Sequence, residues 1–187
     1  MSEVVSHLSA EDLEAGLDHI RSAPRDVGTL DLIVGRPAVG IREELTTGDL
    51  DVDVGLVGDT WHKRRSRMTA DGSPHPLMQL NIMSTRVVAL VAQDRTRWAL
   101  AGDQLFVDLD LSEANVPAGT RLAIGDAIVE VTEQPHLGCA KFVERFGLDA
   151  MKFVNSPKGR ELHLRGINAR VVQPGTIRIG DTVRKML

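Results

Sequence analysis

The sequence predicts a mostly-β fold, in which a β-barrel or closed sheet carries several short peripheral helices. Apolar and polar residues alternate in short segments along much of the chain, which is the pattern of half-buried strands. Two Gly-Asp pairs, at residues 125–126 and 180–181, each stand between short apolar segments, as in type II′ hairpins. The 187 residues, 42% of them apolar, can bury one core, so we expect a single domain over residues 1–187.

An amphipathic helix is expected at the N-terminus, where Ser9 precedes several acidic residues and Pro24 follows. Leu13, Leu17 and Ile20 would share one face of this helix. Residues 1–26 are therefore predicted to be a helical extension of the domain.

Alternation of apolar and polar residues then predicts two strands, at residues 30–34 and 49–54, each with one face exposed to solvent. The next elements are a strand at residues 77–83, a helix with Ser84 as its N-cap and Val87, Val88, Leu90 and Val91 on it, and a short helix at residues 95–100 that stops at Gly102.

The second half of the chain alternates more regularly. A strand is expected at residues 105–109 and a turn at residues 117–119. Residues 121–129 form a predicted hairpin around the first Gly-Asp pair, and residues 177–183 form a second one around the other pair. Between the hairpins, two short helices are expected within residues 139–155, separated at Gly147.

Composition excludes several classes of protein. A net charge of −4 and few aromatic residues argue against nucleic-acid binding, which needs a basic excess or stacking platforms. The single cysteine excludes an intramolecular disulfide and a multi-cysteine zinc site. The longest apolar run has six residues, Val87 to Ala92, so no membrane span is expected. The acidic first twenty residues do not form a signal peptide, which favours a cytoplasmic location.

The segment from Gln134 to Phe142 carries the clearest chemical signal. A loop that contains Pro and Gly leads to Cys139 at the expected start of a helix, near His136 and Lys141. A helix N-terminus and neighbouring cations favour the thiolate, which can act as a nucleophile, a sulfur carrier or a soft metal ligand. The alternative is a buried, inert cysteine, as in many cytosolic proteins.

The order of the motifs resembles that of the MOSC domain family, which is named for the C-terminal domain of molybdenum cofactor sulfurases. The matching segments are the Cys139 loop, residues 55–62 (Gly-Leu-Val-Gly-Asp-Thr-Trp-His), residues 122–126 (Leu-Ala-Ile-Gly-Asp) and residues 165–181 (Arg-Gly-Ile-Asn-Ala-Arg-Val-Val-Gln-Pro-Gly-Thr-Ile-Arg-Ile-Gly-Asp). The resemblance covers roughly residues 30–185 and implies a stand-alone member with a barrel similar to the small domain of pyruvate kinase.

The same resemblance implies a protein of molybdenum-cofactor chemistry. Cys139 would ligate the molybdenum of a molybdopterin-type cofactor or carry sulfur, so the protein would be a molybdenum-dependent oxidoreductase, for instance one that reduces N-hydroxylated compounds, or a sulfur-transfer protein. A redox or sulfur-donor protein would be its partner. The alternative function is a non-catalytic barrel that binds a small anionic ligand or a partner protein, with Cys139 buried and inert.

Basic residues near Cys139 and near residues 59–65 are the candidate cofactor ligands, because arginine forks bind phosphate. The alternative for residues 62–67 is a solvated loop whose charges offset Asp49, Asp51 and Asp53. Arg165 and Arg170, in the closing motif, could face the same cavity as alternating strand positions or could be exposed, and exposure is favoured for Arg165. The histidines lack the close spacing of a metal-ligand motif, so no histidine metal site is expected. Two stretches depart from the family pattern, namely His136 to Gly138, where members often carry Arg and Pro, and Gly102 to Leu105, where an anion-binding arginine is missing. The candidate cofactor-binding residues are Asp59, His62, Arg64, Arg65, His136, Lys141 and Arg170.

Overall fold

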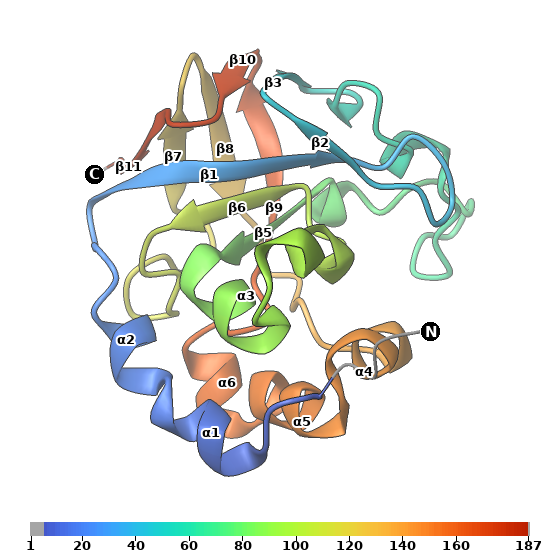
Figure 1. The fold of residues 1–187 in the computed structure, drawn as a ribbon. Coiled ribbons are helices and arrows are strands. Elements are labelled where there is room, and N and C mark those ends of the chain that lie inside the picture. Colours follow the sequence, from blue (N-terminus) through green and yellow to red (C-terminus); the bar gives the residue numbers. More distant parts are fainter. Residues whose placement is uncertain (1–5, 187) are drawn as a thin grey trace.

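Seven strands of the chain close into a barrel, which confirms the predicted fold class (Figure 1). A computed structural model describes residues 6–186, so residues 1–5 of the expected N-terminal extension lie outside the described part. The strands are β1 (Val27–Gly35), β2 (Glu43–Leu45), β3 (Thr47–Asp51), β4 (Gly55–Leu56), β5 (Leu80–Ser84), β6 (Leu105–Asp108), β7 (Arg121–Ile124), β8 (Ala127–Val131), β9 (Ile167–Gln173), β10 (Gly175–Arg178) and β11 (Thr182–Lys185).

Short helices lie outside the barrel, as the sequence predicts. They are α1 (Ala10–Ala15), α2 (Leu17–Arg21), α3 (Thr85–Ala92), α4 (Ala140–Phe146), α5 (Leu148–Asn155) and α6 (Pro157–Glu161), with 3₁₀ turns η1 (Trp61–Lys63), η2 (Pro76–Met78) and η3 (Arg95–Ala101). None of them, within the described residues, is long and apolar enough to cross a membrane.

The barrel runs in the order β1, β11, β7, β8, β9, β5 and β6, and β6 pairs with β1 to close the ring. All neighbours are antiparallel except β5 and β6, which are parallel and are joined through α3 and η3. Parallel neighbours need such a crossover because the chain must return to the same end of the sheet. A separate sheet of β10, β3 and β4 lies beside the ring.

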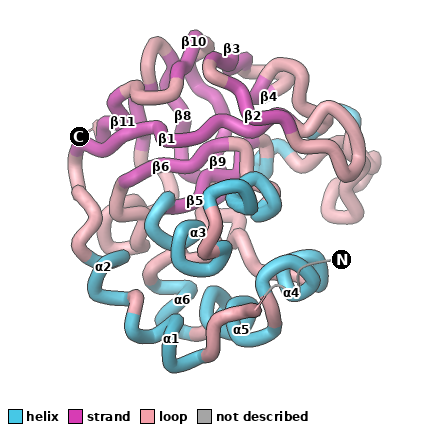
Figure 2. The backbone as a smooth tube through the Cα atoms, in the orientation of Figure 1, coloured by secondary structure: helices cyan, strands magenta, loops and turns pink. Residues whose placement is uncertain are grey.

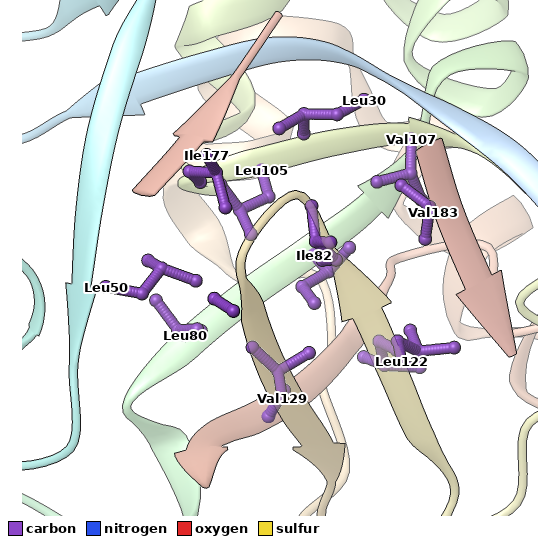
Figure 3. Packing of buried hydrophobic residues seen from close by; sticks show 14 of the residues in the cluster. Leu30, Leu50, Leu80, Ile82, Leu105, Val107, Leu122, Val129, Ile177 and Val183 are labelled. Carbon is purple, nitrogen blue, oxygen red and sulfur yellow. The ribbon is translucent and has the colours of Figure 1, made fainter. Parts of the chain in front are cut away.

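Two apolar clusters stabilise this arrangement. One fills the barrel, where Leu30, Ile82 and Val129 point inward from three strands (Figure 3). The other lies between the barrel wall and the helices, which gather on one side of the molecule (Figure 2). It includes Phe106 from the barrel and Phe146 from α4.

The prediction that one face of the strand at residues 30–34 is exposed to solvent is wrong. Leu30 and Ile33 lie in the barrel interior, whereas Leu32 and Val34 lie beneath the helices. The register of β1 against β6 shifts between Leu30 and Leu32. This bulge reverses the alternation, so residues 30 and 33 share one face. Helices cover the other face, which leaves β1 buried on both sides beyond Asp31.

The predicted N-terminal helix starts where expected, since Ser9 caps it in a capping box with Asp12. It is two short helices, α1 and α2, which meet at Gly16. The expected apolar face is buried all the same. A side chain at Gly16 would meet Leu90 of α3, so the break lets the chain approach that helix closely.

Other boundaries shift slightly. The strand predicted at residues 77–83 starts at Leu80, after the η2 turn, and the strand predicted at residues 49–54 ends at Asp51. The break at Gly147 and the stop at Gly102 are confirmed, and both glycines have a positive φ. Helix α6 was not predicted.

The first Gly-Asp hairpin is confirmed, because Ile124 pairs with Ala127 across Gly125, whose φ is +53°. The second prediction is wrong. β10 pairs with β3 of the small sheet, whereas β11 pairs with β1 and β7 of the barrel. The Gly180-Asp181 turn therefore carries the chain from one sheet to the other. The backbones of Leu30 and residues 180–181 exchange hydrogen bonds that hold this crossing in place.

Candidate functional site

Cys139 occupies the N-cap position of α4, as the sequence predicts, and its thiol is free and exposed. The carbonyl of Cys139 accepts hydrogen bonds from the backbone amides of Phe142 and Val143, which fixes the start of the helix. The alternative interpretation of a buried cysteine is therefore wrong. The thiol is accessible to a cofactor, a partner or a reagent.

The loop before Cys139 is tied to two other elements. Asn155 of α5 clamps Gly138, because its amide accepts from the Gly138 N–H at 2.8 Å and donates to the Gly138 carbonyl at 3.0 Å. A Cβ at Gly138 would come within 3.1 to 3.4 Å of α5 side chains, which explains the glycine. Asn168 of β9 donates to the carbonyls of Gln134 and Pro135. The cysteine is thus presented on a well-anchored loop.

A buried chain of polar groups lies behind this loop. Arg165 donates to Asp103 Oδ2 at 2.7 Å, and Asp103 Oδ1 faces His136 Nδ1 at 3.4 Å. Arg165 is only 7% exposed and also contacts the Phe142 ring, so the expectation of an exposed Arg165 is wrong. The carboxylate of Asp103 supplies the compensation that a buried guanidinium requires.

This buried set of polar groups shifts the pKa values of His136 and Asp103. Burial lowers the pKa of His136 well below 6.5, and the charges of Arg165 and Arg36 lower it further. Burial raises the pKa of the Asp103 carboxyl, and the Arg165 guanidinium opposes that shift. His136 is consequently neutral at neutral pH.

This depressed pKa predicts an acid-sensitive fold. Below about pH 6.5 the unfolded chain binds a proton at His136 that the native protein does not, so stability falls as the pH falls. The contribution is at most about 1.4 kcal/mol per pH unit. Urea unfolding between about pH 7 and about pH 5 should show a shallower dependence in His136→Gln than in the wild type. The exposed His62→Gln variant is the control, and equal slopes in wild type and His136→Gln would contradict the prediction.

A second buried ion pair lies at the end of β1. Arg36 donates to both oxygens of Asp59, at 2.6 and 2.9 Å, and both side chains are almost fully buried. The same guanidinium donates to the Gly102 carbonyl and to Asn81. Asp59, a predicted cofactor-binding residue, thus orients Arg36. It also accepts a hydrogen bond from the backbone amide of Trp61.

Further arginines converge on Gly102. A Cβ at this position would lie 3.6 Å from terminal nitrogens of both Arg42 and Arg145, so the glycine keeps the space between the two guanidinium groups open. Burial, Arg145 and Arg36 lower the pKa of Arg42. Its Nε is buried and, among the described residues, has no hydrogen-bond partner. Such crowding of cations, with an unused donor, is the electrostatic environment of an anion site.

The predicted residues Arg64 and Arg65 lie beside this cluster. Together with Arg36 they line a cavity of about 170 Å³, which Trp61 and Asn81 also line. Burial and the charge of Arg36 lower the pKa of Arg64. No acidic side chain is among the described residues that line the cavity, and because Asp59 offsets the charge of Arg36, the positive charge of its walls comes from Arg64 and Arg65.

The remaining predicted residues are dispersed. His62 lies exposed in η1 and Lys141 lies exposed in α4. Arg170 lies on the outer side of β9 and pairs with Glu130 of β8. Across residues 6–186, no group of three His, Cys, Asp or Glu residues is arranged to hold a metal ion.

Sequence reasoning missed Arg36, Arg42, Arg145 and the buried pair of Asp103 with Arg165. The missing arginine in the Gly102–Leu105 stretch is compensated in charge by Arg36 and Arg42 from the loop after β1 and by Arg145 from α4. No local pattern marks these residues, because they come from separate parts of the chain. Arg145 follows Cys139 on the same helix, about 9 Å further along the axis of α4.

Comparison with known proteins finds one matching family model and several similar structures. The model described as MOSC domain matches residues 76–184. The YuaD protein from Bacillus subtilis has a similar structure, with a TM-score of 0.59 and 16% identity over 84% of this chain and 94% of that one. YiiM from Escherichia coli superposes with a TM-score of 0.53 and 18% identity, covering 85% of this chain and 70% of that chain.

YiiM from Geobacillus stearothermophilus superposes with a TM-score of 0.56 and 16% identity over 86% of this chain and 75% of that chain. At these identities the likeness shows a shared fold. No curated protein sequence matches the chain significantly.

Proposed function

This chain belongs to the MOSC domain family, which is linked to molybdenum-cofactor-related functions, and we propose that it binds a molybdopterin-type cofactor with Cys139 as the molybdenum ligand. The observation that carries the proposal is the exposed thiol of Cys139 on the helix that also brings Arg145 into the arginine cluster. A soft thiolate suits molybdenum, and arginine forks suit a phosphate.

The residues present fit the anionic end of such a cofactor. Arg42 has an unused buried donor, Gly102 leaves the space beside it open, and Arg64 and Arg65 line the neighbouring cavity. The volume of about 170 Å³ is below the roughly 300 Å³ at which small-molecule sites begin. We infer that the residues lining this cavity would hold the phosphate group of the cofactor, since the whole cofactor would exceed its volume.

The bound cofactor would supply a metal centre able to exchange electrons with a substrate. The chain's own contribution is positioning. Asn155 and Asn168 hold the loop that carries Cys139, so the thiol keeps its place when the ligand arrives. Asp59 holds Arg36, which in turn holds the Gly102 carbonyl. The site is thereby organised before binding, which reduces the ordering cost.

A sulfur-carrier role is the second candidate, and the exposure of the thiol favours it as well. In that role the Cys139 thiolate would take the outer sulfur of a donor protein's persulfide and leave the donor as a thiolate. The arginine cluster would then bind an anionic acceptor of the sulfur.

Molybdenum content tests the proposal directly. Wild-type protein purified from a host that makes the cofactor should contain molybdenum, and Cys139→Ser should lose most of it while its circular dichroism stays unchanged. Elemental analysis by mass spectrometry measures the metal. Because Cys139 is the only cysteine, a persulfide assay on the same samples reports the sulfur-carrier role without ambiguity.

A matched pair of arginine variants supplies the control. Arg42→Ala should reduce the molybdenum content, whereas Arg121→Ala, which breaks only an exposed ion pair with Glu130, should not. Equal molybdenum in wild type and Cys139→Ser, or none in the wild type, would contradict the role of Cys139 as metal ligand.

A further inference from the structure

A cavity of about 340 Å³ is lined in part by the loop that precedes Cys139, and none of the clustered arginines is among the residues that line it. Asn168 lines it, whereas Asn81 lines the arginine-lined cavity, and the two side chains share a hydrogen bond of 2.6 Å. The amide pair therefore forms part of the wall between the two cavities. Val131, Pro135 and Ile167 provide an apolar lining on the side of the larger one.

His136 is held at the wall of this larger cavity in a defined orientation. Its Nδ1 is buried 3.4 Å from Asp103 Oδ1 and has no hydrogen-bond partner among the described residues, while Asp103 itself is held by Arg165. The ring as a whole lines the cavity, so the part available to a ligand is the part that carries Nε2. A carboxylate behind one ring nitrogen selects the tautomer at the other.

The nearby carboxylate favours the tautomer that has its proton on Nδ1, and in that tautomer Nε2 is the acceptor of the neutral ring. Burial and the charges of Arg165 and Arg36 keep the ring neutral by lowering its pKa. A ligand that reaches His136 must therefore bring its own N–H or O–H group.

The charged groups around the cavity select the same kind of ligand. Two carboxylates, Glu113 and Glu133, line it against the single cation Arg160. The other imidazole, His163, is occupied, since its Nδ1 contacts the Leu111 carbonyl at 2.6 Å and its Nε2 lies 3.0 Å from Glu113. The cavity wall is thus negative on balance, in contrast to the arginine-lined cavity on the other side of the amide pair.

We propose that the larger cavity is a second ligand site, which takes a small organic cation of the amidine or amine class with an apolar body, bound through its N–H groups to His136 Nε2 and the carboxylates. The apolar walls would cover the body of the ligand, as in small-molecule sites of this size. The site is formed without Cys139 and without the arginine cluster, so it does not depend on the proposed cofactor.

Benzamidine and benzoate form a matched pair of probes, equal in shape and opposite in charge. In a calorimetric titration, benzamidine should bind the wild-type protein at least tenfold more tightly than benzoate. The His136 imidazole nitrogen signals should shift in NMR spectra as benzamidine is added. Glu133→Gln should weaken benzamidine binding, and His136→Phe should remove it.

Two controls keep the outcome interpretable. Ala118→Trp, at an exposed turn that lines the cavity, should block binding without disturbing the buried Asp103 pair, and so replaces His136→Phe if that variant does not fold. Cys139→Ser and Arg64→Ala should bind benzamidine as the wild type does, so failure of the cofactor proposal would leave this result unchanged. Equal or tighter binding of benzoate, or unshifted His136 signals, would overturn the proposal.

Discussion

Replacing Arg36 with methionine is expected to lower the free energy of unfolding by about 3–5 kcal/mol. The change leaves the carboxylate of Asp59, which is 1% exposed, without its two guanidinium hydrogen bonds. It also removes a donor from the Gly102 carbonyl. An uncompensated buried charge costs far more than the apolar side chain can recover. Urea unfolding followed by tryptophan fluorescence measures the loss.

Two further variants separate this pair from ordinary surface charges. Asp59→Leu combined with Arg36→Met removes both charges and should recover much of the loss, because no unpaired ion remains. Arg121→Met breaks an exposed pair with Glu130 and should cost at most about 1 kcal/mol. A loss for Arg36→Met as small as that for Arg121→Met would show that the Asp59 carboxylate is not buried as described.

Replacing Arg165 with methionine is expected to produce a loss of similar size, about 3–5 kcal/mol, since Asp103 is completely buried. A second consequence follows for His136. With the Arg165 charge removed and Asp103 still facing the ring, the pKa of His136 should rise, because that charge is one cause of its depression. An NMR titration of the imidazole measures the shift.

Arg165→Lys is the matched variant, because it keeps the charge but cannot reproduce the planar fork that reaches both Asp103 and the Ala101 carbonyl. It should lose less stability than Arg165→Met and leave the His136 titration closer to that of the wild type. An unchanged His136 titration in Arg165→Met would contradict the electrostatic coupling of the two residues.

The two Gly-Asp turns show how far local sequence predicts the fold. Both contain Ile-Gly-Asp between short apolar segments, and both make the chain turn with glycine at positive φ. Only the turn at Gly125 joins paired strands, whereas the turn at Gly180 leads from the small sheet into the barrel. A turn sequence determines local dihedral angles, but the pairing partner is chosen by contacts that lie far along the chain.

The candidate site divides in the same way. Cys139 could be identified from its own loop, because proline, glycine and a helix start are local signals. Arg165 could not be assigned, because the sequence around it does not reveal that Asp103, 62 residues earlier, is its partner. Burial of a charge depends on its partner, so such residues are invisible to periodicity.

The sequence by itself determined the family resemblance, the mostly-β class, most helices and strands, and Cys139 as the residue of interest. These properties follow from short-range patterns of apolar residues, glycines and caps. Tertiary structure alone decided that Cys139 is exposed, that Arg36, Arg42 and Arg145 meet at Gly102, and that an amide pair stands between two cavities of opposite charge. The physical reason is that barrel closure brings together side chains from distant parts of the chain. Their charges and hydrogen-bonding groups interact only at that short distance.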